Sequence, residues 1–477
     1  MVFSSVIFLF YFLPIALLLY FLAPKLLQNS VLLLISLLFY AWGEPVYVFL
    51  MLLSIALNFM FGLAIDRGSP SIRNISMLLG AAANLSILGY FKYAEFLAAN
   101  LEQFAGITGV KGLVDHLPLP LGISFFTFQA LSYLIDVYRR TSPAQRNPFR
   151  VALYIALFPQ LIAGPIVRYN TISDQLAYRT HSLNNFADGL ARFIIGLGKK
   201  VLIANTLAAP ADSAFMLGED QLSPGTAWLG IVCYSLQIYY DFSGYSDMAI
   251  GIGRMIGFEF PENFRHPYAA TSIREFWRRW HISLSTWFRD YLYIPLGGSR
   301  MGDVRTAFNL VLVFFLCGLW HGANWTFVIW GLFHGLFLAL ERTRFGSWVE
   351  RSPRGLKHAY VAAVFMAGWV LFRAESFNDA THYFRALVGF GVESELRYSW
   401  QFLADNQVRW TILLAIPGCA PIWRSLSRLI ESDTQDYLRW RFELVRIGML
   451  ISLVCILVLS ALQLMSDTYN PFIYFRF

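Results

Sequence analysis

The chain has 477 residues, of which 57% are hydrophobic, 17% are aromatic and only 14% are charged, with a formal net charge of +7. Soluble proteins of this length carry about 25% charged residues, so the composition excludes an ordinary soluble domain and indicates a polytopic membrane protein. The basic residues form short clusters between apolar runs. This pattern is typical of cytoplasmic loops rather than of a nucleic-acid-binding surface, and we expect no nucleic-acid partner.

Apolar runs that predict membrane-spanning or re-entrant segments recur along the chain. They cover residues 1–24, 26–43, 46–65, 74–91, 117–137, 151–167, 306–340, 357–372, 410–423 and 447–466. Prolines 118, 120, 159 and 165 predict broken or re-entrant backbone, which is tolerated at membrane depth only inside protein or along a cavity. We therefore expect an all-α fold with about ten to twelve spans plus re-entrant pieces, in a single domain over residues 1–477.

The distribution of charge predicts the topology. Arginines are concentrated at 424–446, whereas 374–408 carries more acidic than basic residues. By the positive-inside rule 424–446 is cytoplasmic, and 374–408 and the C-terminal tail lie outside. Arg305 and Arg342 are cytoplasmic by the same rule, so the hairpin between them turns on the far side.

Residues 306–340 contain no Asp, Glu, Lys or Arg over 35 positions. A straight helix of that length would measure roughly 50 Å, against about 30 Å for the core of a bilayer. We therefore predict a break at 321–324, where the sequence reads His-Gly-Ala-Asn. The break places His321 at or near membrane depth, and an ionisable group there is a functional hypothesis.

The chemistry of His321 has two interpretations. Uncharged aromatic surroundings keep an imidazole neutral, and a neutral imidazole can act as a general base toward a hydroxyl group. The alternative is a histidine that is hydrogen-bonded between helices. The residues alone leave both open.

A second feature is the arginine- and tryptophan-rich segment 274–289. Its apolar positions fit one interfacial amphipathic helix: Phe276, Trp277, Trp280, Leu284, Trp287 and Phe288. Its arginines can hold lipid headgroups or the phosphates of a nucleotide-bearing donor. His281 lies in this segment.

Other polar residues have structural interpretations. Asp241 and Asp247 are six residues apart and do not share a helix face, so they predict hydrogen-bonded structural acids. His334 predicts core packing. The four cysteines lie in apolar surroundings and predict buried thiols, and the absence of a His, Cys, Asp and Glu cluster predicts no metal site.

Several stretches resemble the membrane-bound O-acyltransferase family, and within it a bacterial branch that acetylates exported polymers. They include LPLGISFFTFQALSYLIDVYR at 119–139, YYDFSGYSDMAIGIG at 239–253, RRWHISLS at 278–285 and LWHGANW at 319–325. They occur in family order, and the core of the likeness spans approximately residues 80–345.

The resemblance implies a ring of helices around a funnel, with His321 as the essential catalytic residue and His281, a second candidate, near the cytoplasmic mouth. It makes Arg278 and Arg279 candidates for contacts to a cytoplasmic thioester donor such as acetyl-CoA. It also implies the bacterial inner membrane, exported acetyltransferase partner proteins and a polysaccharide acceptor such as alginate, with no bound cofactor. One alternative is a D-alanyl transferase for teichoic acids. Another is a transporter or flippase without chemistry of its own.

Overall fold

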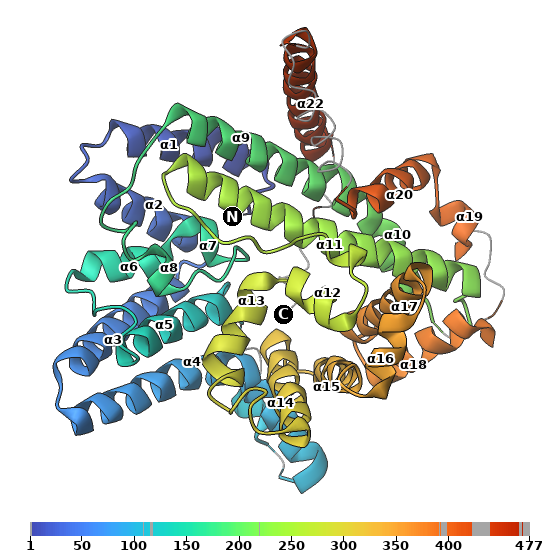
Figure 1. The fold of residues 1–477 in the computed structure, drawn as a ribbon, viewed down its shortest axis with the longest axis horizontal. Helices are drawn as coiled ribbons and strands as arrows, with labels where there is room; N and C mark the ends of the chain where they lie inside the picture. The colour runs from blue at the N-terminus through green and yellow to red at the C-terminus, as the bar shows by residue number, and fades with distance from the viewer. Residues whose placement is uncertain are drawn as a thin grey trace. The chain divides into compact units, whose positions relative to one another are not determined.

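The computed structural model describes residues 2–107, 109–114, 118–218, 220–390, 392, 398–421, 439–466 and 470. Every regular element among them is helical, which confirms the all-α class (Figure 1). Within these ranges six helices are long and apolar enough to cross a membrane, and three shorter apolar helices accompany them. The chain is therefore a multi-pass membrane protein. The predicted cytoplasmic segment 424–446 and the C-terminal tail fall largely outside the described residues.

The chain divides into two compact units. The first unit contains Met1–Phe193 and Met248–Pro261, and the second contains Ile194–Asp247 and Glu262–Arg476. Two helices, α9 (Leu183–Gly198) and α11 (Pro224–Met255), begin in one unit and end in the other. The single domain expected over residues 1–477 stays a prediction.

The first unit is built from helices α1 to α8. They are η1 (Phe8–Phe12), α1 (Leu13–Leu22), α2 (Gln28–Gly43), α3 (Tyr47–Arg67), α4 (Pro70–Ala105), η2 (Lys111–Leu113), α5 (Ile123–Tyr138), α6 (Pro148–Ala156), α7 (Phe158–Leu161) and α8 (Tyr169–Ile172). The buried amides of Asn58 and Asn84 join α3 to α4 by reciprocal hydrogen bonds of 3.0 and 2.8 Å. Such pairs satisfy polar groups that lipid cannot solvate.

Two sequence predictions concern this unit. The broken entry at Pro118 and Pro120 is confirmed, because α5 begins only after Gly122, which has a left-handed φ of 73°. The end predicted for a span at Phe91 is wrong, because α4 continues to Ala105. Charged residues interrupt the hydropathy of that stretch without interrupting its helix, since Lys, Glu and Ala are good helix formers.

The second unit contains the later helices. They are η3 (Lys199–Asn205), α10 (Thr206–Met216), η4 (Pro267–Ala269), α12 (Ile273–Arg279), α13 (Ile282–Phe288), η5 (Arg289–Tyr293), α14 (Asp303–His321), α15 (Trp325–Leu340), α16 (Arg344–Arg351), α17 (Arg354–Arg373), α18 (Phe377–Arg385), η6 (Ala386–Phe390), α19 (Trp400–Leu403), α20 (Asn406–Gly418) and α22 (Arg439–Ser466).

Two ion pairs hold η3 against α11. Lys200 pairs with Asp241 at 2.7 Å, with both side chains almost fully buried, and Lys199 pairs with Asp247 at 2.6 Å. Both acids therefore have lysine partners, in keeping with the structural role predicted for them. The turn containing both lysines is π-helical, a geometry that inserts one extra residue and is found mostly as a local bulge.

Helices α14 and α15 form a tight hairpin. The predicted break is confirmed: α14 ends at His321, Gly322 is extended, and the Asn324 side chain accepts a hydrogen bond from the amide of Thr326 at the start of α15. Gly318 of α14 faces Gly331 of α15, and neither position has room for a methyl group, because each backbone lies against the carbonyl of the other helix. These glycines fix where the end of α14, and so His321, lies relative to α15.

The predicted single helix over 274–289 is wrong. The structure has two short helices, α12 and α13, separated at His281, which adopts a left-handed φ of 42°. Asn263 causes the separation: its carbonyl accepts from the amide of Ile282 at 2.9 Å, and its side chain accepts from the amide of Ser283 at 3.2 Å. The predicted apolar face is almost wholly buried in protein rather than lying at an interface.

Candidate active site

His321 lies in an aromatic cage. It is 5% exposed, and its ring centroid is 5.0 Å from Trp320, 5.0 Å from Trp330 of α15 and 5.3 Å from Phe372 of α17. These neighbours carry no charge. These are the uncharged aromatic surroundings that the sequence predicted for His321.

His281 is also buried, at 1% exposure. Its ring packs edge-on against Phe242 at 4.6 Å and lies 6.2 Å from Trp320, the neighbour that it shares with His321. Burial lowers the pKa of His281 from 6.5 to about 3. The structure thus brings both predicted histidines next to one indole, that of Trp320.

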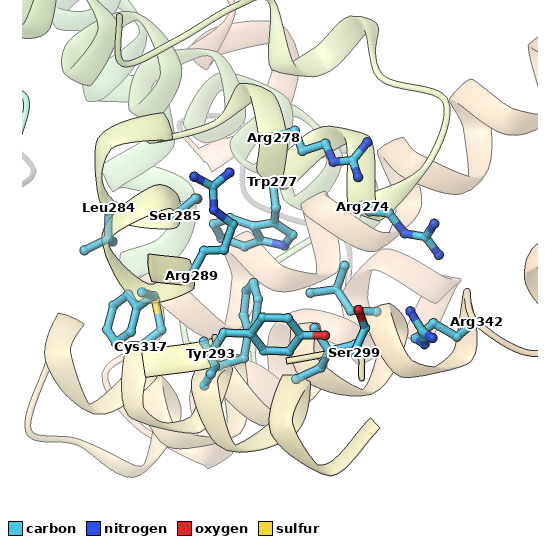
Figure 2. Close-up of a pocket in the computed structure, with 15 residues that line it drawn as sticks. Arg274, Trp277, Arg278, Leu284, Ser285, Arg289, Tyr293, Ser299, Cys317 and Arg342 are labelled. Atoms are coloured by element: carbon cyan, nitrogen blue, oxygen red, sulfur yellow. The ribbon is translucent and has the colours of Figure 1, made fainter. Parts of the chain in front are cut away.

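A cavity of about 360 Å³, which we call the arginine cavity, opens between α12, α13, η5 and α14 (Figure 2). Its lining combines four arginines with an apolar floor: Arg274, Trp277, Arg278, Leu284, Ser285, Phe288, Arg289, Tyr293, Ser299, Leu310, Val313, Phe314, Cys317, Leu338 and Arg342. Ligand sites typically measure about 300–1,000 Å³. The cavity is therefore large enough to hold a ligand or the arm of one.

The arginines of this cavity differ in their partners. Arg289 pairs with Asp290 at 2.6 Å, and Arg342 pairs with Asp303 at 3.2 Å. Arg278 is exposed and has no ion pair among the residues that the structure describes. Its guanidinium is therefore available to an anionic ligand, which it can hold through two parallel hydrogen bonds.

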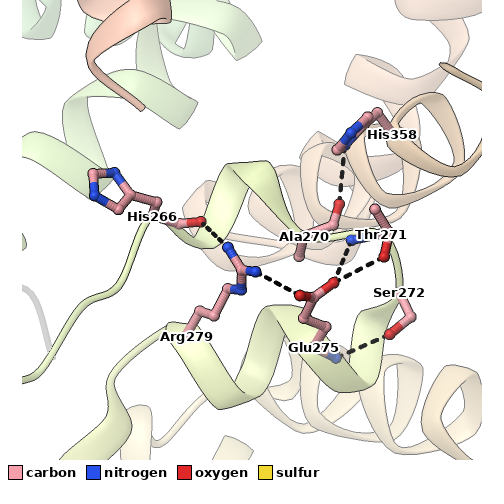
Figure 3. Close-up of polar contacts among 7 residues, drawn as sticks. All are labelled: His266, Ala270, Thr271, Ser272, Glu275, Arg279 and His358. Carbon is pink, nitrogen blue, oxygen red and sulfur yellow. Dashed lines mark hydrogen bonds and ion pairs between the residues drawn. The ribbon is translucent and has the colours of Figure 1, made fainter. Parts of the chain in front are cut away.

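Arg279, the neighbouring candidate, lies outside the cavity lining. Figure 3 shows its guanidinium donating to the Glu275 carboxylate at 2.6 Å and to the carbonyl oxygen of His266 at 3.3 Å. Burial by itself would raise the pKa of Glu275, but hydrogen bonds from Thr271 and the charge of Arg279 outweigh it and lower that pKa. In this structure Arg279 braces the segment that precedes α12.

The start of α12 is held by a second carboxylate, that of Glu341, which follows α15. Its two oxygens accept from the amides of Ile273 at 2.5 Å and Arg274 at 2.9 Å, and the Tyr360 hydroxyl donates to it at 3.3 Å. Glu341 is 8% exposed. This contact docks α12 onto α15 and so positions Trp277 and the α12 arginines at the cavity.

The arginine cavity approaches His321 through Cys317. Cys317 lines the cavity and lies four residues before His321 on α14, one helical turn away on the same face. It is 5% exposed, as predicted for a buried thiol, whereas the same prediction is wrong for Cys455, which is exposed on α22. The cavity thus extends to within one turn of the candidate base.

A second cavity, which we call the α18 cavity, has about 370 Å³ and lies at the far end of α17. It is lined by Phe215, Met216, Leu217, Gly218, Arg373, Ala374, Glu375, Asn378, Asp379, His382 and Tyr383. Arg373 directly follows Phe372, which touches the His321 ring. The carbonyl of Glu375 accepts from Asn324 at 2.9 Å, three residues after His321. His321 lines neither cavity, but it lies one helical turn from Cys317 of the arginine cavity and contacts Phe372, the residue before Arg373 of the α18 cavity.

The sequence did not identify several residues of this site. Trp330 and Phe372 complete the cage from other helices, and Arg342 and Cys317 line the arginine cavity from distant positions. His334 is 1% exposed and packs between Trp277 and Trp330, in keeping with the core role predicted for it. The one usable signal was the four-residue spacing of Glu275 and Arg279, which is typical of an ion pair on one helix face. No group of three metal-ligating side chains occurs in the described ranges.

Comparison with known proteins shows which family this chain resembles. A family model described as the membrane-bound O-acyltransferase family matches residues 78–372. The probable alginate O-acetylase AlgI of Pseudomonas putida is 42% identical over the full length of both chains. The peptidoglycan O-acetyltransferase of Helicobacter pylori is 35% identical over 100% of this chain and 98% of its own. The teichoic acid D-alanyltransferase of Bacillus subtilis is 29% identical over 46% of this chain and 58% of its own.

Proposed function

The chain belongs to the membrane-bound O-acyltransferase family, and on that premise we propose that it moves an acetyl group across the bacterial inner membrane. The donor is a cytoplasmic thioester, acetyl-CoA. The acceptor is a hydroxyl of an exported partner protein or of a polysaccharide such as alginate. The observation that carries the proposal is the position of His321, one helical turn from Cys317 of the arginine cavity and in contact with Phe372, which precedes Arg373 of the α18 cavity.

The arginine cavity suits the donor. Its rim offers the unpaired guanidinium of Arg278 and that of Arg274, which match the phosphates of a nucleotide. Its apolar depth leads to Cys317, which suits the slender thioester arm. By the positive-inside rule this rim, which includes Arg342, faces the cytoplasm.

The α18 cavity suits the acceptor. Its lining is polar, and it lies in the part of the chain that the charge distribution assigns to the outside. A hydroxyl that enters here approaches His321 past Phe372. Donor and acceptor can therefore meet at one residue without either crossing the membrane.

At that meeting point His321 acts as general base. The neutral imidazole takes the proton of the acceptor hydroxyl, and the oxygen attacks the thioester carbonyl carbon. The tetrahedral intermediate collapses with cleavage of the C–S bond, and the imidazolium returns its proton to the departing thiolate. The products are an acetyl ester and free CoA, and the base is regenerated.

The principal experiment uses purified protein in vesicles, with radiolabelled acetyl-CoA on the cytoplasmic side and a candidate exported acceptor on the other. We expect label to reach the acceptor with the wild type. With His321→Ala, which removes the base from a folded protein, we expect at least a 10²- to 10⁴-fold loss. Normal transfer by His321→Ala overturns the assignment of the base.

The same assay separates the alternatives. Transfer from a carrier-bound D-alanyl thioester but not from acetyl-CoA identifies a D-alanyl transferase. Donor and acceptor that emerge chemically unchanged on the opposite side identify a transporter.

A second experiment tests the donor site with a matched pair of variants. Arg278→Gln removes a cavity-lining charge, whereas Arg279→Gln removes a charge that the structure pairs with Glu275. We expect Arg278→Gln to raise KM for acetyl-CoA about 10- to 100-fold, the value of one charged hydrogen bond, and to leave KM for acetyl-pantetheine unchanged because that donor lacks the nucleotide. Equal effects on both donors, or a larger effect on acetyl-CoA KM in Arg279→Gln, contradict this placement.

A further inference from the structure

Two buried indole N–H groups near His321 have no acceptor in the structure. They belong to Trp277 of α12 and Trp330 of α15, which are 7% and 1% exposed, and neither Nε1 has a hydrogen-bond partner among the described residues. An indole nitrogen can only donate. Leaving a buried donor unsatisfied costs about 1–3 kcal/mol, so two such groups in contact require an explanation.

The two indoles connect the arginine cavity to His321. Trp277 lines that cavity (Figure 2), and its ring centroid is 5.7 Å from that of Trp330. The Trp330 ring is in turn 5.0 Å from the His321 ring, at an interplanar angle of 85°. The two indole rings thus form a continuous chain of contacts from the arginine cavity to His321.

Both indoles are held in place by backbone contacts. Trp330 precedes Gly331, whose backbone abuts the carbonyl of Phe314 in α14. Trp277 lies on α12, whose first amides are bound by Glu341, and its ring packs on Phe314 at 5.0 Å. Donors fixed in this way need no reorganisation when charge develops next to them.

We propose that the indole N–H groups of Trp277 and Trp330 are the donors that bind the thioester carbonyl oxygen and stabilise the oxyanion of the tetrahedral intermediate. This inference rests on the proposed function. When the acceptor oxygen adds to the carbonyl carbon, the carbonyl oxygen becomes negative, and residues 306–340 contain no lysine or arginine to stabilise it. Two fixed N–H dipoles in an uncharged, water-poor site meet that need, because a hydrogen bond to an ion is strongest at low dielectric constant.

The test is Trp330→Phe, which removes the N–H and keeps an aromatic ring, and Trp277→Phe in parallel. The matched control is Trp369→Phe. Trp369 is equally buried and lies 5.7 Å from Phe372 of the same cage, but its Nε1 already donates to the Tyr268 hydroxyl at 3.2 Å. Steady-state acetyl transfer gives kcat and KM, and thermal unfolding in detergent gives stability.

The catalytic role predicts that activity and stability separate. For Trp330→Phe we expect kcat to fall about 10²- to 10³-fold, the usual loss for one oxyanion donor, with KM for the thioester changed less than kcat. Its thermal stability should not fall, since the variant removes an unsatisfied buried donor. Trp369→Phe should lose stability and keep kcat, because it breaks an existing hydrogen bond away from the reacting atoms.

A kcat for Trp330→Phe within threefold of the wild type overturns the inference. So does a parallel loss of kcat and stability like that of a structural tryptophan, which would indicate that the N–H serves packing or a bound water. Either result with an active wild type leaves the proposed function intact. A wild type that releases no CoA from acetyl-CoA overturns the proposed function and this inference with it.

Discussion

The glycine contact between α14 and α15 allows a precise perturbation of the site, Gly331→Ala. A Cβ at Gly331 would lie 3.2 Å from the Cα of Gly318 and within 3.0 Å of the Phe314 carbonyl oxygen, a separation that real Cβ atoms essentially never show. The obstructing atoms are backbone and cannot rotate away. The two helices must therefore separate, by on the order of 1 Å, to return to ordinary contact distance.

Two magnitudes follow from this displacement. Overpacking a core costs about 1–3 kcal/mol, of which the better helix propensity of alanine recovers about 1 kcal/mol, so the stability loss should be modest. Catalysis should suffer more. His321 ends α14 and Trp330 adjoins the new methyl group, and a 1 Å misplacement of reacting groups can cost about 10²-fold in rate.

The assay compares single-turnover acetyl transfer and thermal unfolding for Gly331→Ala and for Gly89→Ala. Gly89 lies inside α4, and a Cβ there meets nothing within 4 Å. We expect Gly89→Ala to match the wild type in transfer rate and to gain up to about 1 kcal/mol in stability from the better helix propensity of alanine. Wild-type transfer rates for Gly331→Ala would refute the argument that this contact sets the geometry of the site.

Three further predictions concern the surroundings of the site. Burial lowers the pKa of His281 from 6.5 to about 3, so between these pH values the unfolded chain binds a proton that the folded chain does not. The free energy of unfolding should therefore fall by up to about 1.4 kcal/mol per pH unit below pH 6.5. Thermal unfolding at pH 7.5 and at pH 5 should show a smaller loss of stability for His281→Gln than for the wild type. Glu341→Ala leaves two amides at the start of α12 without their acceptor, so KM for acetyl-CoA should rise about tenfold or more. Glu341→Gln keeps one acceptor oxygen and should raise KM less. Equal KM values for the two variants would contradict this reasoning. Lys200→Met removes the buried lysine that pairs with Asp241, which should cost about 3–5 kcal/mol. Lys200→Met with Asp241→Leu should recover most of the loss in unfolding measurements, and an equally unstable double variant would show that the pair is not the cause.

The sequence by itself determined the class of the protein and the position of its central break. Composition and uncharged runs are local properties, and they suffice for a multi-pass helical protein because lipid requires every backbone group to be satisfied within a helix. The break after His321 was predictable because Gly322 and Asn324 favour a helix end and a helix start. Motif order identified the family for the same reason, since it is read directly along the chain.

Only the tertiary structure decided which side chains share the site. Trp277, Trp330 and Phe372 come from three helices far apart in sequence, and no periodicity relates them. The single helix predicted over 274–289 was divided at His281 because Asn263, a distant residue, binds the amides that would have continued it.

The different environments of Arg278 and Arg279 have the same origin. The two arginines are neighbours in the sequence and were equally plausible there as contacts to the acyl donor. In the structure Arg278 lines the arginine cavity, whereas Arg279 is bound by Glu275 and the His266 carbonyl. A side chain's role depends on the charges and free space that other elements bring to it. Those are properties of packing, which one stretch of sequence does not contain.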